Sequence, residues 1–229
     1  MLLLPSAMKL KKNPDGRTLD EVLPPAAYAR WAALKQRYIG RDSSIEKERP
    51  LIVAQKLYAA AVKRSDLGGK VLSPVIDEVM KQRKMQYTPT SLKFSIKDPK
   101  AAIADFREEG INSRELACMD EMLDSIDRDL PQMLARANAW AVGDVEALRA
   151  MPRVRTDSCW STWSETEALR KRGIEDVENR VKAQWVKIAE ESLTNNLSTF
   201  AQLSMRDLLE PDGYLAKLRA KGYTVEEPM

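Results

Sequence analysis

The chain has 229 residues, of which 44% are hydrophobic and 31% are charged, a balance typical of an ordinary globular protein with room for a buried core. It contains no histidine, which excludes any chemistry that needs an imidazole as base, nucleophile activator or metal ligand. The net charge of +3 is too small to indicate a nucleic-acid partner, and no segment reaches the roughly 18 apolar residues of a membrane span.

Helix signals dominate the first part of the chain. Thr18 and Glu21 form a capping-box pattern for a short turn that stops at Pro24. Apolar residues at helical spacing then predict one helix that ends at Gly40 and a second that begins at Pro50. Several amphipathic helices are therefore expected to build the core.

The periodicity changes in the next segment. Ser73 is expected to be a helix N-cap, with Pro74 in the first helical position. Apolar and polar residues alternate over residues 92–96, which predicts a strand. Asp98 is expected to cap the helix that follows.

The longest periodic run begins near Ser113. Pro131 should kink or split it, because proline lacks the N–H that a helix interior requires. Gly143 is expected to end the run, and Asp144 to cap a short helix. Residues 151–163 are expected to form a loop.

The C-terminal segment predicts a strand, a helix and a strand. Residues 197–203 are β-prone, a helix around Tyr214 ends at Gly222, and residues 223–225 form a last short strand. The predicted fold is therefore α/β and helix-dominated, with a small, mostly parallel sheet covered by helices. The absence of a clear linker predicts a single domain over residues 1–229.

Two residue types stand out as candidate sites. Cys118 and Cys159 form either a disulfide or two buried free thiols, and the two alternatives stay open. Trp160 and Trp163, in the predicted loop, either contact a ligand or partner or cover the core. The other tryptophans lie on helical stripes and are expected in the core: Trp31, Trp140 and Trp185.

Several segments spread over most of the chain carry a resemblance to a known family. They are residues 10–16, 28–31, 37–41, 136–144, 198–203 and 210–226. Together they resemble the TraB/GumN family, in its GumN-type proteobacterial branch, which belongs with the Tiki-like proteins. The resemblance implies metal-dependent hydrolysis, in which histidines of two GxxH motifs hold a divalent ion that activates water.

Neither motif is present in this chain. Alignment without a gap places residues 204–207 on the second GxxH, so that Ser204 replaces the glycine and Asp207 replaces the histidine. The first motif would precede Met1, together with the opening strands of the family. The chain is therefore expected to begin inside the family domain, near the end of a strand at Leu2–Pro5.

These observations lead to two main functional hypotheses. The first is a non-catalytic, degenerate member, a pseudoenzyme, that binds a protein partner or a second copy and needs no cofactor. The second is a hydrolase or peptidase with a rebuilt site, in which Asp207, Arg206 and Ser204 are the candidate catalytic residues and Asp207 is the candidate metal ligand. A helix N-cap at Asp207 is the structural alternative.

A third hypothesis is a structural role, in which an open sheet edge pairs with another chain. The family is usually exported, so the resemblance implies a periplasmic protein if a signal peptide lies upstream of Met1. Without such a peptide the protein is expected in the cytoplasm.

Overall fold

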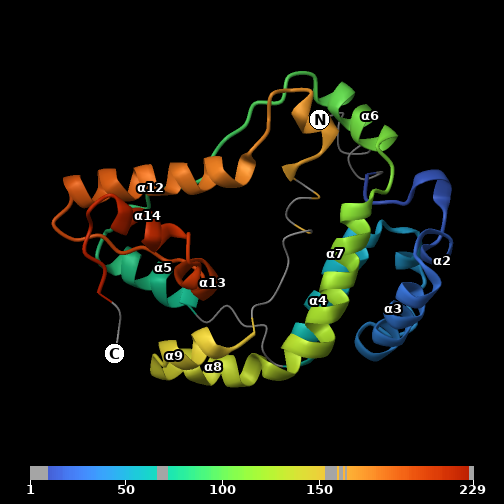
Figure 1. The fold of residues 1–229 in the computed structure, drawn as a ribbon, viewed down its shortest axis with the longest axis horizontal. Coiled ribbons are helices and arrows are strands. Elements are labelled where there is room, and N and C mark those ends of the chain that lie inside the picture. The colour runs from blue at the N-terminus through green and yellow to red at the C-terminus, as the bar shows by residue number, and fades with distance from the viewer. Residues whose placement is uncertain (1–9, 66–71, 153–158, 160–161, 163, 227–229) are drawn as a thin grey trace. The chain divides into compact units, whose positions relative to one another are not determined.

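The structure, a computed structural model, describes residues 10–65, 72–152, 159, 162 and 164–226, and its regular elements are helical (Figure 1). In the first half they are η1 (Pro14–Gly16), α2 (Leu19–Val22), α3 (Pro25–Tyr38), η2 (Ser44–Lys47), α4 (Pro50–Arg64), α5 (Leu72–Gln82) and α6 (Pro99–Glu108). In the second half they are α7 (Ser113–Asp124), η3 (Ser125–Asp129), η4 (Leu130–Gln132), α8 (Met133–Val142), α9 (Val145–Ala150), α11 (Glu167–Arg170), α12 (Val177–Asn195), α13 (Met205–Leu209) and α14 (Tyr214–Ala220).

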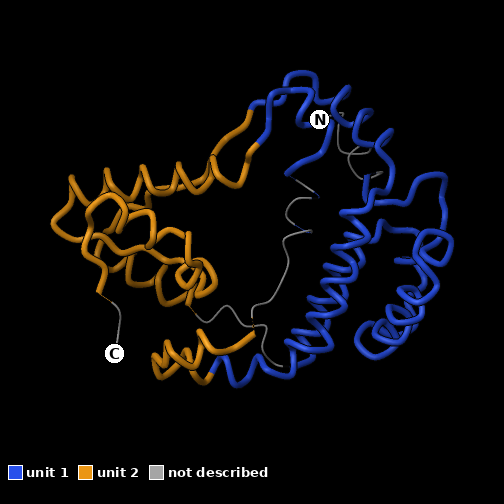
Figure 2. The backbone as a smooth tube through the Cα atoms, viewed as in Figure 1, with its two compact units in different colours: residues 1–68, 95–137, 154–175 blue, residues 69–94, 138–153, 176–229 orange. Residues whose placement is uncertain are grey.

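The chain divides into two compact units, each assembled from three stretches of sequence (Figure 2). Unit 1 comprises residues 1–68, 95–137 and 154–175. Unit 2 comprises residues 69–94, 138–153 and 176–229. The single-domain prediction concerns the whole chain, whereas the packing described below belongs to each unit by itself.

Unit 1 holds the main hydrophobic core, in which α4 packs along α7 and both contact α3. Trp31, Leu57, Met119 and Leu123 are fully buried at this junction. On α4 the inward positions recur every three to four residues, as an amphipathic helix requires. Each such side chain stabilises the fold by about 1.5–3 kcal/mol through removal of apolar surface from water.

Unit 2 is built on α12, which contacts α14, and α14 in turn contacts α13. The rings of Trp185 and Tyr214 lie 4.6 Å apart between centroids. Most of the large apolar side chains that are exposed in the described residues belong to this unit. They are Leu72, Val75, Val79, Met85, Tyr87, Trp140, Val142, Leu193, Leu197 and Phe200.

The predicted parallel sheet is wrong. In the described part of the chain no strand forms, and the only β-type pairing there is an isolated antiparallel bridge between Lys12 and Glu48. Residues 92–96, 197–203 and 223–225 are neither helical nor paired, so the C-terminal strand-helix-strand is wrong as well. β-Prone residues become a strand only when a neighbouring chain segment accepts their backbone hydrogen bonds. The strand expected at Leu2–Pro5 lies outside the described residues.

Most predicted helix ends are confirmed. Asp98 accepts a hydrogen bond from the backbone N–H of Ala101 at 3.1 Å, and Asp144 accepts one from Ala147 at 2.9 Å. The long run is split at Pro131, where a π-helical turn and a 3₁₀ turn, η3 and η4, separate α7 from α8.

Two local predictions are wrong. α5 already begins at Leu72, so Ser73 lies inside the helix and is not its N-cap. Trp140 lies on the outer side of α8 with 45% of its surface exposed, whereas Trp31 is fully buried. The π-helical and 3₁₀ turns around Pro131 interrupt the regular α-helical period on which the prediction for Trp140 depended.

Candidate functional site

The three candidate catalytic residues, Ser204, Arg206 and Asp207, lie at the start of α13 in unit 2. Ser204 is the N-cap of α13, and its Oγ accepts the backbone N–H of Asp207 at 3.1 Å. The same hydroxyl donates to Oδ2 of Asp207 at 2.7 Å. The expectation that Asp207 is itself the N-cap is therefore wrong by three residues: Asp207 stands in the first turn, where its charge suits the positive end of the helix.

Arg206 balances this carboxylate. Its guanidinium lies 3.6 Å from Oδ1 of Asp207, and both side chains are partly exposed. Ser204 and Arg206 thus face the two oxygens of Asp207 from the same short helix. The structure therefore brings the three predicted residues together. The hydrogen bonds between Ser204 and Asp207 cap the N-terminal end of α13.

The turn that follows holds α13 against α14. Gly213 donates its N–H to the carbonyl of Glu210 at 3.0 Å. A Cβ atom at this glycine would lie 2.7 Å from the carbonyl oxygen of Asp207 and 2.7 Å from Cβ of Glu210, closer than real contacts allow. Glycine is therefore required at position 213 by the close approach of the backbone.

Tyr214, which follows this turn, lies close enough to Lys182 and Asp207 to interact with their charges. Partial burial raises the pKa of the Tyr214 phenol, and the negative charge of Asp207 raises it further. A hydrogen bond from Lys182 to Glu178 raises the pKa of the lysine, and the ion pair spans 2.8 Å. Both shifts favour the protonated forms, so Tyr214 and Lys182 are hydrogen-bond donors at neutral pH, and the carboxylates of Asp207 and Glu178 lie near them.

No metal cluster is found in the part of the chain that the structure describes: there, no three Cys, Asp or Glu side chains come close enough together to hold an ion. The carboxylates of Asp207 and Glu178 are each engaged with a cationic neighbour on their own helix.

Cys118 and Cys159 are joined as a disulfide in unit 1, with their Cα atoms 4.5 Å apart. Both cysteines are buried, and Leu51 and Met122 pack against them. The bond ties the middle of α7 to a residue 41 positions further along the chain. Trp160 and Trp163, the predicted contact residues next to Cys159, lie outside the described residues.

A buried ion pair in unit 1 was not foreseen from the sequence. Arg49, directly before α4, donates from Nε to both carboxylate oxygens of Glu115 at 3.1 and 3.2 Å and from Nη2 to Oε2. Nη2 also donates to the carbonyl of Gly110, and Oε1 accepts the N–H of Leu51. The two side chains expose only 7% and 1% of their surface.

The sequence carried a misleading signal for this pair. Glu115 stands three residues after the N-cap Asn112, a position at which a glutamate is expected to close a capping box. Instead its carboxylate turns to Arg49, 66 residues away. The face of the Arg49 guanidinium lies 4.9 Å from the ring of Phe106. The partners of Arg49 and Glu115 described here are groups of unit 1 itself, so this cluster stabilises the fold of that unit.

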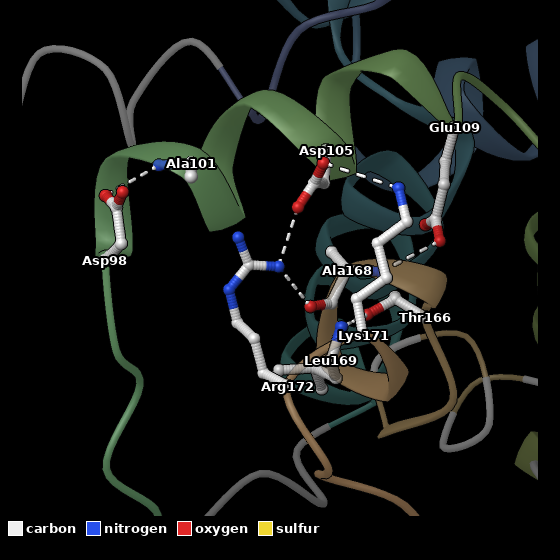
Figure 3. Close-up of polar contacts among 9 residues, drawn as sticks. All are labelled: Asp98, Ala101, Asp105, Glu109, Thr166, Ala168, Leu169, Lys171 and Arg172. Atoms are coloured by element: carbon white, nitrogen blue, oxygen red, sulfur yellow. Dashed lines mark hydrogen bonds and ion pairs between the residues drawn. The ribbon is translucent and has the colours of Figure 1, made fainter.

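A second polar cluster joins α6 to α11 (Figure 3). Arg172 donates to Asp105 at 2.7 Å and to the carbonyl of Ala168 at 2.6 Å, and Lys171 lies 3.5 Å from the same aspartate. Glu109 accepts the backbone N–H of Ala168 at 3.2 Å. The hydrogen bond from Arg172 holds the pKa of the Asp105 carboxyl below its ordinary value, and the charge of Lys171 lowers it further.

We expect Asp105→Asn to remove part of the acid sensitivity of unit 1. Because the pKa of Asp105 is lowered in the folded chain, its contribution is present above the unfolded value of about 3.9 and is lost as the pH falls through the folded value. The urea midpoint of the variant should therefore fall less steeply below about pH 4 than that of the wild type. Glu108→Gln, at an exposed carboxylate on the same helix, is the control and should keep the wild-type slope.

Arg172→Ala gives an independent check, since it removes the donor and leaves the carboxylate. Its pH profile should flatten in the same range. A wild-type slope in both Asp105→Asn and Arg172→Ala would contradict the assignment.

Comparison with known proteins gives one match. A family model described as TraB/PrgY/gumN family matches residues 2–227, nearly the whole chain. No curated protein and no solved structure matches. Among the helices that the structure describes, none combines the length and the apolar character needed to cross a membrane.

Proposed function

Because the chain belongs to the TraB/PrgY/gumN family, which it matches from residue 2 to residue 227, we propose that it is a non-catalytic member that acts as a binding or interaction domain. One observation carries the proposal. Ser204 and Asp207, which stand where the resemblance places the glycine and the histidine of a GxxH motif, form the capping pair of α13.

The capping pair competes with metal binding. A divalent cation would need the lone pairs of Asp207 that now accept from Ser204, and it would approach the positive guanidinium of Arg206 and the positive end of α13. A single carboxylate also falls short of the three or more protein ligands of a typical catalytic metal site. These contacts favour a structural role for Ser204 and Asp207, as the cap of α13, over a role in metal binding.

A titration with Zn²⁺ and with Mn²⁺ tests the metal-free proposal. We expect no saturable one-to-one heat in isothermal titration calorimetry of the full chain. Asp207→Ala and the neighbouring Asp212→Ala are the matched pair of variants. One-to-one binding that Asp207→Ala abolishes and Asp212→Ala retains would overturn the proposal and favour the metal-dependent hydrolase.

Hydrolysis of model substrates provides a second test of the non-catalytic proposal. Across ester and peptide substrates, with and without added metal, we expect the same background rate for the wild type and for Asp207→Asn. A rate that Asp207→Asn removes, while Asp212→Asn does not, would instead identify Asp207 as a catalytic residue of a rebuilt site.

The disulfide supports a proposal on the compartment. Disulfides persist in oxidising surroundings such as the bacterial periplasm and are rare in the cytosol. A buried disulfide between Cys118 and Cys159 therefore favours an exported protein. Labelling of thiols in intact cells expressing the native gene tests this: both cysteines should resist alkylation until the protein is denatured and reduced.

A further inference from the structure

Residues 197–203 of unit 2 form a segment that starts with a bend at Leu197 and contains no helix, turn or further bend. Among the residues that the structure describes, none makes a hydrogen bond to the main-chain groups of this segment. Its side chains are β-prone, and both Leu197 and Phe200 are strongly exposed, Phe200 at 69%. An exposed segment of this kind is a template for pairing with another chain.

The segment is held in place at its start. The Thr199 hydroxyl donates to the carbonyl of Ser192, at the end of α12, at 3.2 Å, and the Asn196 side chain donates to the same hydroxyl at 3.3 Å. Both bonds are made by the side chain of Thr199, and neither uses a main-chain group of residues 197–203. Anchoring lowers the entropy that must be lost when a second strand pairs with it.

The sequence around the segment suits a second copy of the same chain. Residues 192–205 contain no charged side chain, so two copies meet without like-charge repulsion. Around Phe200 the pattern is also symmetrical: Leu197 and Leu203 stand three positions to either side. An antiparallel pair centred on Phe200 places Leu197 opposite Leu203 of the other copy and the two Phe200 rings opposite each other.

We infer that residues 197–203 pair antiparallel with the same residues of a second copy, forming an isologous dimer centred on Phe200. This inference rests on the proposed interaction role and names its partner. Self-pairing about a two-fold axis is the commonest way in which soluble chains associate. A two-stranded ribbon alone is marginally stable, so the dimer is expected to be weak and to form in proportion to concentration.

The test uses charge at the two-fold axis. In the full chain, Phe200→Lys and Phe200→Glu each place two like charges opposite each other, and each variant alone should sediment as a monomer at concentrations where the wild type forms a dimer. Mixed one to one, the two variants should form a heterodimer, because Lys and Glu then meet across the axis. Val142→Lys, at another exposed apolar residue of unit 2, is the matched control and should dimerise like the wild type.

Several outcomes would overturn the inference: a wild type that stays monomeric at high concentration, a Phe200→Lys variant that dimerises normally, or a mixture that stays monomeric. Circular dichroism of each variant checks that the helices are intact. Amide exchange gives a second readout, since alternate amides of residues 197–203 should become protected as the wild-type concentration rises. A monomeric wild type would remove the dimer and leave the non-catalytic assignment to the metal titration and the turnover assay.

Discussion

Glu115→Ala should lower the free energy of unfolding of unit 1 by about 3–5 kcal/mol, because it leaves the guanidinium of Arg49 buried without its counter-charge. Arg49 and Glu115 share three hydrogen bonds and are almost fully shielded from water. The loss should appear as a lower urea midpoint of unfolding. Unfolding can be monitored by tryptophan fluorescence, to which the buried Trp31 contributes.

A surface ion pair provides the matched control. Arg30 and Asp124 lie 2.7 Å apart but expose 34% and 40% of their side chains. Asp124→Ala should therefore cost less than about 1 kcal/mol. The combined replacement of Arg49 by Met and Glu115 by Leu should recover much of the loss, since it removes both charges together. Equal effects of Glu115→Ala and Asp124→Ala would contradict the role of burial.

Replacing both Cys118 and Cys159 by Ala should lower the stability of unit 1 by about 2–4 kcal/mol. The bond closes a loop across 41 residues, and its removal gives the unfolded chain back the entropy of that loop. Loss of two buried sulfur atoms from the contact with Leu51 and Met122 adds a packing cost. The urea midpoint in the absence of reductant measures the effect.

Reductant separates the bond from the packing. The wild type should lose stability in dithiothreitol and gain two titratable thiols after denaturation, whereas the double alanine variant should be unchanged. A wild type with two free thiols and the same midpoint in both conditions would show that the bond does not form.

The helices could be predicted because their ends are determined by residues a few positions away in the sequence. Asp98, Asp144 and Gly143 act on groups within five positions of themselves, and Pro131 acts within its own helix. The family was also recognisable from segments of the chain, and the family match confirms it. A helix start close to Asp207 was expected and α13 does begin there, although its cap is Ser204 and not Asp207, and no strand precedes it.

The sheet could not be predicted from the same local signals. Alternating apolar residues indicated a strand at 92–96, 197–203 and 223–225, yet none of these segments has a paired neighbour in the described part of the chain. Likewise, the helical stripe that included Trp140 was regular in sequence, yet the helix is interrupted at Pro131 and Trp140 is exposed.

The sequence by itself determined the absence of imidazole chemistry, most of the helix boundaries and the family, because each depends on residue identity or on contacts a few positions apart. Only the tertiary structure decided the pairing of Arg49 with Glu115 and the bond between Cys118 and Cys159. It also decided that residues 197–203 pair with no other strand in the described part of the chain. The physical reason is the separation along the sequence between the groups that interact. A helix satisfies its hydrogen bonds within four residues, whereas an ion pair, a disulfide or a strand depends on a partner that folding must bring from far along the chain.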